Sequence, residues 1–403
     1  MGSVLVLLLL LSIPFEVISQ TPNTEERTIL LHLKQKLGNP PFFQSWTSTS
    51  SPCDWPGINC TENSVTGISL RNINITQKLP PIICNLKNLT VLDLAFNYIP
   101  GEFPTFLYNC TKLQVLDLSQ NYFVGPIPSD INRISGLQYI DLGANNFSGD
   151  IPPRIGRLSE LRTLYLHQNE FNGTFPKEIG DLSNLEVLGL AYNDKFVPAK
   201  IPEEFGKLKR LKTLWMADAN LIGEIPDSIA NLSSLESLDL WNNYLLGQIP
   251  SDINRISGLQ VLDLGANYFS GDIPPNVGRL SELRTLFLDW NEFNGTFPKE
   301  IGNLSNLEVL GLASNKKFVP ATIPDEFGKL NKLKTMLMRD ANLIGEIPDF
   351  IANFSSLRYF DFSRNNLVGS IPSGFILLRN LIHLDLSNNR LSGVIPTSVE
   401  LDE

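Results

Sequence analysis

The sequence predicts an α/β solenoid, a superhelix of stacked repeats with a parallel β-sheet on its concave face and a helix that caps its N-terminal end. Three observations predict this fold. A pattern of leucines and asparagines returns every 24 residues, a turn rich in Gly and Pro closes most copies, and a helical segment stands directly before the first copy. A repeat this short cannot bury its apolar face alone, so successive repeats must stack into one continuous core.

The repeated unit is a Leu-x-x-Leu-x-Leu-x-x-Asn frame followed by a variable stretch. Clear copies begin at Leu89, Leu113, Leu137, Leu161, Leu185, Leu211, Leu235, Leu259, Leu283, Leu307, Leu333, Leu357 and Leu381. Val65 opens a degenerate first copy, so about 14 repeats occupy residues 65–396. The steps are 24 residues except two of 26, whose extra residues fall within 194–200 and 316–322. Units close with turns such as 125–128, Gly-Pro-Ile-Pro, where Gly permits a positive φ and Pro ends any helix.

Each frame predicts a short strand with alternating sides. In residues 113–121 the leucines at 116 and 118 face the core, while Val115, Asp117, Ser119 and Gln120 face out. Neighbouring strands then stack into one parallel sheet. We expect a run such as Asp93, Asp117 and Asp141 to form a solvated strand face.

The asparagine at the ninth position of the frame predicts a ladder of buried amides, because such an amide can satisfy the free backbone groups of adjacent turns. The ladder positions are Asn97, Asn121, Asn145, Asn169, Asn193, Asn243, Asn267, Asn291, Asn315, Asn365 and Asn389. Ala219 and Ala341 interrupt it, and we expect the neighbouring Asn220 and Asn342 to point outward.

The N-terminal end predicts secretion. An apolar run from Val4 to Leu11 is followed by small residues before Gln20, so residues 1–19 are predicted to be a signal peptide. The run is too short to span a bilayer, which needs ~20 apolar residues, and no other segment reaches that length. Ten Asn-x-Ser/Thr sequons suit a glycosylated extracellular chain. They are at Asn59, Asn74, Asn88, Asn109, Asn146, Asn172, Asn231, Asn294, Asn303 and Asn353.

Residues 20–64 are predicted to cap the open end of the core, and residues 397–403 form a short tail. The cap contains a helix over residues 23–37, with Asn23 and Glu26 spaced as a capping box and Gly38 as its stop. Its apolar face consists of Ile29, Leu30, Leu33 and Leu37. A solenoid needs such a cover because its terminal repeat would otherwise expose an apolar edge.

Four cysteines near the N-terminus favour disulfides over metal ligands or redox chemistry in a secreted chain. Cys53 and Cys60 are the expected pair in the cap. Cys84 and Cys110 lie 26 residues apart in adjacent repeats, so stacking could bring them within bridging distance. Free thiols at 84 and 110 are the alternative.

A block of repeats is duplicated. Residues 128–240 match residues 250–362 at a constant offset of 122, with about four in five positions identical. Several differences fall on predicted exposed strand positions, whereas the inward leucines hardly change. They are Tyr139 against Val261, His167 against Asp289, Gln168 against Trp290, Tyr192 against Ser314, Trp215 against Leu337 and Ala217 against Arg339. Two readings stay open, free drift of exposed positions and divergence of a binding face.

Charge and residue content exclude several functions. A net charge of -10 and a pI near 5.0 argue against nucleic acid or an anionic membrane surface as partner. The histidines, His32, His167 and His383, are predicted on the cap helix and on two distant strands, which leaves no credible catalytic triad or His-rich metal site. We expect no enzyme activity, no cofactor and no metal.

Several segments together resemble a known family. The cap helix, the segment from Ser45-Trp46 to the Cys53–Cys60 stretch, and the Asn-x-Phe-x-Gly-x-Ile-Pro-type turns resemble plant leucine-rich-repeat receptor-kinase ectodomains over the whole mature chain. The loop 193–198, Asn-Asp-Lys-Phe-Val-Pro, and the following Trp215-Met216 are similar to the HAESA-like class. This resemblance implies a plant-type leucine-rich-repeat superhelix. It also implies a small secreted peptide as ligand and a co-receptor with a shorter leucine-rich-repeat ectodomain.

The sequence departs from that family in two respects. It ends at Glu403 just after a repeat turn, with no transmembrane segment or kinase motif in the chain. The Arg-x-Arg pair with which many such receptors hold a peptide C-terminus is also absent. A complete family binding site therefore does not follow from the resemblance.

A binding face is predicted on the exposed strand positions of the middle repeats, where aromatic and charged residues stand together as in binding hot spots. The candidates are Tyr165, His167, Trp215, Asp218, Trp241, Phe287, Asp289, Trp290, Arg339 and Asp340. Parallel strands ~4.8 Å apart would line them along one inner face long enough for an extended peptide.

Two functions remain open. The first is a receptor-like extracellular module that binds a secreted peptide or protein, secreted into the apoplast or on the outer face of the plasma membrane. The second is a soluble apoplastic inhibitor of cell-wall hydrolases, similar to polygalacturonase inhibitors, or a decayed receptor fragment.

Overall fold

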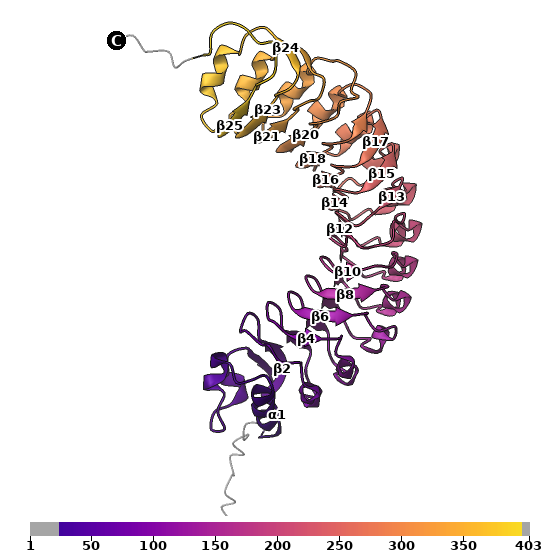
Figure 1. Ribbon diagram of the computed structural model, residues 1–403, viewed down its shortest axis with the longest axis vertical. Coiled ribbons are helices and arrows are strands. Elements are labelled where there is room, and N and C mark those ends of the chain that lie inside the picture. The colour runs from indigo at the N-terminus through magenta and orange to yellow at the C-terminus, as the bar shows by residue number, and fades with distance from the viewer. Residues whose placement is uncertain (1–23, 397–403) are drawn as a thin grey trace, which may run out of the picture.

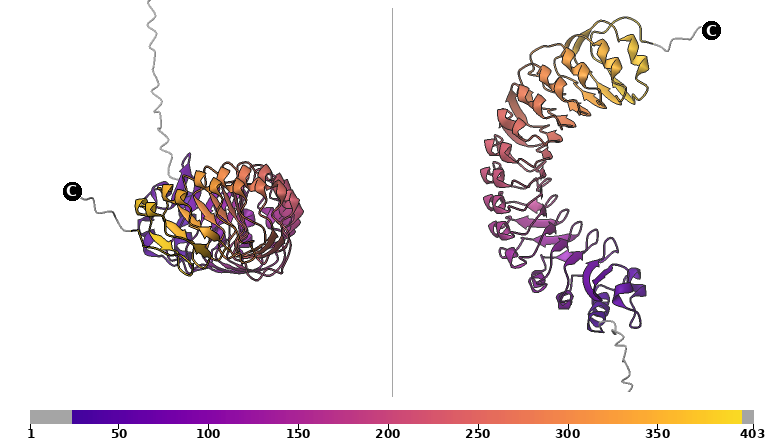
Figure 2. Two further views of the ribbon diagram at one scale, coloured as in Figure 1. Left: turned by 90° about the horizontal axis from the view of Figure 1, so that it is seen from above. Right: turned by 180° about the vertical axis from the view of Figure 1, so that it is seen from behind.

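The computed structural model describes residues 24–396, which form a single curved row of stacked coils (Figure 1). Strands line the inner side of the arc and short helical turns line the outer side. Figure 2 shows the same arc from above and from behind. The predicted α/β solenoid with a parallel concave sheet is therefore confirmed.

The concave face is one sheet that runs the length of the described chain. Its first pair, β1 and β2, is antiparallel, and every later strand is parallel to its neighbours. Its strands are β1 (Ile58–Thr61), β2 (Ser64–Ser69), β3 (Val91–Asp93), β5 (Val115–Asp117), β7 (Tyr139–Asp141), β9 (Thr163–Tyr165), β11 (Val187–Gly189), β12 (Thr213–Trp215), β14 (Ser237–Asp239), β16 (Val261–Asp263), β18 (Thr285–Phe287), β20 (Val309–Gly311), β21 (Thr335–Leu337), β23 (Tyr359–Asp361) and β25 (His383–Asp385). The register places equivalent positions of successive repeats side by side.

Each coil returns along the convex side through a short 3-10 helix. These are η1 (Pro41–Ser45) and η2 (Pro52–Asp54) in the cap, then η3 (Pro81–Asn85), η4 (Thr105–Asn109), η5 (Ile131–Arg133), η6 (Pro153–Arg157), η7 (Lys177–Asp181), η8 (Glu203–Lys207), η9 (Asp227–Asn231), η10 (Ser251–Arg255), η11 (Pro275–Arg279), η12 (Lys299–Asn303), η13 (Asp325–Lys329), η14 (Asp349–Asn353) and η15 (Ser373–Leu377). A Pro directly before or at the start of most of these turns fixes φ near the helical value and cannot extend a strand ladder.

A second row of very short strands follows the concave strands in most coils. They are β4 (Pro100–Gly101), β6 (Tyr122–Gly125), β8 (Asn146–Gly149), β10 (Glu170–Phe171), β13 (Ile222–Gly223), β15 (Tyr244–Gly247), β17 (Tyr268–Gly271), β19 (Glu292–Phe293), β22 (Ile344–Glu346) and β24 (Asn366–Val368). This row breaks between β10 and β13 and again between β19 and β22. Both breaks coincide with the two 26-residue repeats, so the extra residues interrupt pairing on this side only.

The core is one cluster of leucine, isoleucine and phenylalanine side chains that runs through all coils. Phe171 and Phe196 stack at 6.0 Å between ring centroids, and their counterparts in the second copy, Phe293 and Phe318, stack at 6.2 Å. Complete burial of such side chains contributes roughly 1.5–3 kcal/mol each relative to exposure.

The predicted asparagine ladder is present. In one rung the Nδ2 of Asn121 donates to the carbonyls of Leu94 and Leu118, and its Oδ1 accepts the backbone N–H of Ile99 at 2.9 Å. Each rung thus joins two coils through groups that would otherwise be buried without partners.

The two interruptions of the ladder differ from the expectation. Asn220 and Asn342 do not simply point outward but are half-buried, and the Nδ2 of each donates into the enlarged loop of the preceding repeat. The acceptors are the carbonyl oxygens of Phe196 and Phe318 at 3.0 and 2.8 Å. The longer loop brings these carbonyls within reach, which the 24-residue repeats cannot do.

The N-terminal cap consists of α1 (Thr24–Lys36), η1, η2 and β1. The buried carboxylate of Glu26 accepts hydrogen bonds from the Ser64 hydroxyl at 2.8 Å and the Val65 N–H at 3.0 Å, which ties the helix to the first repeat. Trp46 and Trp55 stack at 5.1 Å beneath it. Asn23, the predicted partner of Glu26 in a capping box, lies outside the described residues.

Both expected cysteine pairs are disulfides. Cys53 and Cys60 close the cap loop, and Cys84 and Cys110 join η3 to the residue after η4. Adjacent repeats place the second pair with 4.6 Å between Cα atoms. The chain end nearest the cap is therefore cross-linked twice.

The predicted signal peptide, residues 1–19, and the tail 397–403 lie outside the described residues. Within 24–396, no helix has the length and apolar content needed to cross a bilayer.

Candidate ligand-binding face

The first copy of the duplicated block carries a continuous chain of aromatic side chains on the concave sheet. Tyr165 lies 5.6 Å from His167, His167 lies 5.1 Å from Trp215, and Trp215 lies 5.6 Å from Tyr192, all between ring centroids. The ring of Tyr139 continues the chain at 6.5 Å from Tyr165. These contacting rings occupy the concave surface of the first copy.

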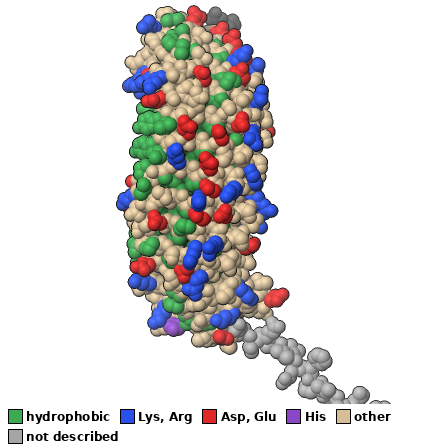
Figure 3. Space-filling model, turned by 90° about the vertical axis from the view of Figure 1, so that its right-hand side faces the viewer, with side chains coloured by type: hydrophobic (Ala, Val, Ile, Leu, Met, Phe, Trp, Pro, Cys, Tyr) green, Lys and Arg blue, Asp and Glu red, His purple; other side chains and the backbone are tan. Residues whose placement is uncertain are grey.

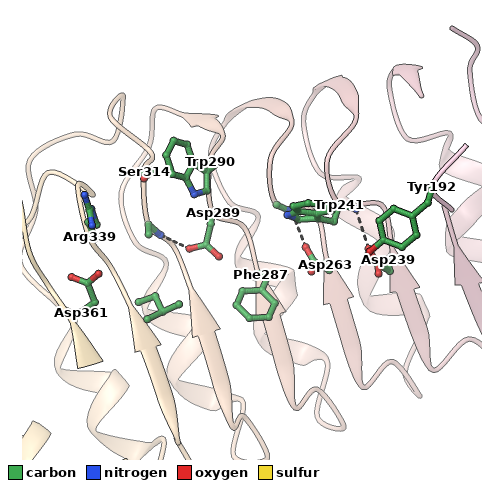
Figure 4. A pocket seen from close by; sticks show the side chains of 13 residues that line it. Tyr192, Asp239, Trp241, Asp263, Phe287, Asp289, Trp290, Ser314, Arg339 and Asp361 are labelled. Carbon is green, nitrogen blue, oxygen red and sulfur yellow. Dashed lines mark hydrogen bonds between the residues drawn. The ribbon is translucent and has the colours of Figure 1, made fainter. Parts of the chain in front are cut away.

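The second copy carries an open hollow instead. It has a volume of about 680 Å³ and is bordered by aromatic, acidic and small side chains (Figure 4). Its lining residues are Tyr192, Asp239, Trp241, Asp263, Gly265, Phe287, Asp289, Trp290, Ala313, Ser314, Leu337, Arg339 and Asp361. The hollow extends from the end of the first copy, across the unduplicated junction residues 241–249, to β23.

The repeat frame explains where each side chain of the hollow points. The fifth frame position lies between two buried leucines and faces the concave surface, as at Asp239, Asp263 and Phe287. The eighth position has a left-handed backbone in nearly every coil, with φ of 56° at Trp290. That backbone conformation, which is uncommon for a bulky residue, is consistent with the 67% exposure of Trp290. Trp241, at the seventh position, is 40% exposed.

Glycines in the strands make room for these side chains. A Cβ at Gly189 would lie 2.5 Å from Tyr165 Cδ1, and a Cβ at Gly311 would lie 2.2 Å from Asp289 Oδ2 and 2.5 Å from Phe287 Cδ1. Gly189 and Gly311 are counterparts in the two copies. The same missing side chain therefore admits a tyrosine in one copy and a carboxylate in the other.

The carboxylates of the hollow have raised pKa values. Burial raises the pKa of Asp263 to about 6. The hydrogen bond that its carboxylate accepts from the backbone N–H of Gly265 acts in the opposite direction and lowers this pKa. Burial, together with the charge of Asp263, raises the pKa of Asp289 to about 7, although the Ala313 N–H donates to its carboxylate at 2.6 Å. Burial also raises the pKa of Asp239. In the first copy burial lowers the pKa of His167.

The expectation of a solvated acidic strand face was wrong for the first repeats. Asp117 and Asp141 are buried, and so is Ser119, whose hydroxyl donates to Asp117 at 2.6 Å. Long neighbouring side chains on the concave face cover them. Burial raises the pKa of Asp141 to about 6 as a result. An outward-facing position on an inner, curved sheet is thus not an exposed one.

The predicted binding residues divide into three groups. Trp241, Phe287, Asp289, Trp290 and Arg339 line the hollow together. Tyr165, His167 and Trp215 belong to the aromatic chain of the first copy, where they are half-buried rather than exposed.

Asp218 and Asp340, the remaining two, lie outside both sets. The carboxylate of Asp218 accepts from Asn242 at 3.1 Å, and that of Asp340 pairs with Lys316 at 3.4 Å.

Sequence reasoning missed Asp239, Asp263 and Asp361, because an acidic residue at the fifth position recurs along the whole chain and carries no local signal. It also left out Tyr192 and Ser314, although both were noted as differences between the copies.

One cluster of two aspartates and a histidine has side chains of the types that bind metal ions. In the described part of the chain, ligand atoms of Asp361, His383 and Asp385 lie within 4.8 Å of one another. Exposed groups of this kind are common without a metal, so the cluster supports no assignment here.

The predicted sequons lie away from the concave sheet, apart from Asn59 in β1. Eight are exposed, and Asn88 and Asn231 are half-buried. Figure 3 shows the convex side, where charges of both signs are interspersed and hydrophobic side chains gather along one margin. Glycans at these positions would leave the hollow accessible.

Matches to family models agree with this geometry. The leucine-rich repeat N-terminal domain model matches residues 23–61, and the leucine-rich repeat region model matches 153–245. Leucine-rich repeat models also match 87–147 and four single units at 258–280, 282–304, 356–378 and 380–400. The fold and these matches define a leucine-rich-repeat solenoid with its own N-terminal cap.

Solved structures extend the likeness over nearly the whole chain. The Arabidopsis receptor kinase HAESA, in complex with the peptide hormone IDA and the co-receptor SERK1, is 30% identical, with a TM-score of 0.74. That match covers 92% of this chain and 75% of HAESA's. The plant peptide hormone receptor RGFR1 in complex with RGF2 is 30% identical over 85% of this chain and 65% of its own, with a TM-score of 0.73. The chain belongs to the family of plant leucine-rich-repeat receptor ectodomains.

Curated relatives match over short segments. Receptor-like protein 52 of Arabidopsis thaliana is 47% identical over 74 residues, 18% of this chain. The match spans only 9% of that relative's length.

Proposed function

We propose that the chain is an extracellular recognition module that binds a secreted peptide or protein along its concave face, with the hollow between β14 and β23 as the principal contact. The carrying observation is that two exposed tryptophans, Trp241 and Trp290, border an open hollow that none of the predicted glycosylation sites lines. Large aromatic side chains beside charges provide most of the binding energy at protein interfaces.

The relatives support a peptide as ligand. HAESA and RGFR1 were each solved with a peptide hormone, and this chain shares their fold over most of its length. An extended peptide could follow the parallel strands, whose side chains stand at regular spacing across the face. We propose further that the protein acts in the apoplast or at the outer face of the plasma membrane. A co-receptor with a shorter repeat ectodomain, as SERK1 is for HAESA, could complete the complex.

The test is calorimetric titration of the full chain, made through a plant secretory pathway, with a panel of secreted plant peptides. We expect micromolar or tighter binding of at least one peptide. Trp241→Ala with Trp290→Ala should weaken it at least ~30-fold, since even one hot-spot residue contributes ~2 kcal/mol or more.

The matched control removes two equally exposed aromatics from another face. Tyr244 and Tyr268 stack on the second strand row with centroids 6.2 Å apart, and their double alanine variant should bind as the unchanged protein does. A folded protein that binds no peptide would reject the proposal and favour inhibition of a cell-wall hydrolase. Binding that survives the tryptophan changes would place the contact elsewhere.

A further inference from the structure

We infer that the hollow holds the positively charged side chain of a basic residue, arginine or lysine, in the bound peptide. The seat consists of Asp239 and Asp263 on adjacent strands, with Trp241 beside them and Asp289 at the far side (Figure 4). This inference rests on the proposed function and specifies the chemistry of its ligand.

The N-terminal repeats contain a filled example of such a seat. Asp93 and Asp117 occupy the fifth frame position of adjacent repeats, as Asp239 and Asp263 do. The guanidinium of Arg71 bridges their carboxylates at 3.4 and 3.3 Å. The same guanidinium lies 4.7 Å from the centroid of the Phe96 ring. The fold therefore already binds one guanidinium between two successive aspartates and an aromatic face.

The cation that fills the first seat is missing from the second. Arg71 stands at the seventh frame position of the repeat before Asp93, and the equivalent residue before Asp239 is Ala217. Among the described residues, no Lys, Arg or His side chain lies within ion-pair distance of Asp239, Asp263 or Asp289. The one cation that lines the hollow, Arg339, lies at its other end beside Asp361.

The carboxylates are also oriented for a ligand. The backbone N–H of Trp241 donates to Oδ1 of Asp239 at 3.0 Å, and the backbone N–H of Gly265 donates to Oδ1 of Asp263 at 2.9 Å. These bonds hold both side chains at the lining of the hollow, and the second oxygen of each accepts no hydrogen bond from another described residue. A cation there would also meet the exposed indole faces, an arrangement favoured by roughly 0.5–2 kcal/mol.

The affinity of these aspartates for a basic side chain should fall in acid. Asp263 and Asp289 have pKa values of about 6 and about 7 through burial, and the other titratable groups that line the hollow are Tyr192, Asp239, Asp361 and Arg339. As the pH falls through this range the carboxylates take up protons and lose the charge that attracts the ligand. We expect affinity for a basic peptide to fall from pH 7.5 to pH 5.5.

The experiment is selection of a phage-displayed library of random linear peptides on the full chain, followed by titration of the selected peptides. We expect arginine or lysine to be enriched at one position. Replacement of that arginine by citrulline, which keeps the shape without the charge, should weaken binding by about tenfold or more, because hydrogen bonds to charged groups contribute ~1.5–3 kcal/mol.

The variant Asp239→Asn with Asp263→Asn keeps both Oδ1 acceptors and should lose the preference for arginine over citrulline. Asp117→Asn with Asp141→Asn, at the same frame positions of earlier repeats, should keep it. Peptides that bind without an enriched basic residue would overturn the inference and leave the proposed function standing. A selection that enriches no peptide would reject both. The citrulline comparison needs only the unchanged protein, so it decides the matter even if a variant fails to fold.

Discussion

The two copies of the duplicated block, residues 128–240 and 250–362, share a core and differ in their concave faces. Equivalent leucines such as Leu164 and Leu286 are fully buried in both, and the stack of Phe171 and Phe196 recurs as Phe293 and Phe318. On the face, Trp215 and Tyr192 close the surface of the first copy. Leu337 and Ser314 replace them in the second and leave the hollow open.

The difference teaches that a solenoid separates stability from recognition. Inward residues are constrained by dense packing on both sides, so a duplicated copy keeps them. Positions on the concave face contact few groups beyond their equivalents in adjacent coils. A change there alters shape and charge at little cost to the fold.

The largest expected effect tests whether the two cores are equivalent. Leu164→Ala and Leu286→Ala should each destabilise the local coil by about 3 kcal/mol, because each leaves a cavity in a packed core. Hydrogen exchange of amides in β9 and β18 measures this locally, which avoids assuming two-state unfolding. Losses that differ by more than about 1 kcal/mol would break the claim of a shared core.

The next effect concerns the hollow alone. Ser314→Tyr with Leu337→Trp gives the second copy the rings of the first and should fill the hollow. We expect affinity for a selected peptide to fall by roughly 10- to 100-fold, since anchor side chains lose their pocket. The reverse change in the first copy, Trp215→Leu, should change affinity less, because Trp215 does not line the hollow. Equal losses in the two variants would show that the faces do not differ in function.

A smaller effect is an opposite pH dependence of folding stability at two equivalent positions, Asp289 in the second copy and His167 in the first. The pKa of Asp289 is raised in the folded chain to about 7, so the stability from its neutral form is present below the unfolded value and is lost as pH rises through 7. Asp289→Asn should match the unchanged protein at pH 4 and exceed it by about 1–2 kcal/mol at pH 8, measured by urea unfolding.

The counterpart His167 should behave in the opposite sense. Its pKa is lowered by burial, so its stabilising neutral form is present above the unfolded pKa and is lost as pH falls through the folded pKa. His167→Asn should therefore gain relative stability on the acid side. A gain on the alkaline side for His167→Asn would contradict the assigned burial.

The smallest effect on stability is expected at two ion pairs that occupy equivalent positions beside the second strand row. Lys195 pairs with Glu170 in the first copy, and Lys317 pairs with Glu292 in the second. All four side chains are largely exposed, so solvent screens the attraction. Glu170→Gln and Glu292→Gln should leave thermal unfolding unchanged within error in both copies. A clear loss in one copy would reveal a difference outside the concave face.

The sequence was sufficient to predict the repeat frame, the ladder, the cap and the class of fold, because each depends on a spacing that recurs along the chain. The Cys53–Cys60 pair also follows from spacing and compartment, whereas for Cys84 and Cys110 the structure decides between a bridge and free thiols. The interrupted rungs at Asn220 and Asn342 were misjudged, because their partners lie in loops whose path spacing alone does not define.

The lining of the hollow was predicted only in part. Exposed tryptophans and unusual charges stood out, so Trp241, Trp290, Asp289 and Arg339 were found. Asp239 and Asp263 were not, because they look identical to Asp93 and Asp117 in sequence. What separates the two pairs is Arg71, which lies beside one and has no equivalent beside the other.

The most direct test of the central claim is hydrogen–deuterium exchange of the full chain, with and without a peptide selected on it. Binding in the hollow predicts slowed exchange in the segments that end β14, β16, β18 and β21, and no change in the segments of β7 and β9. Protection confined to β7–β9, or to the convex turns η6–η9, would contradict the assignment of recognition to the hollow.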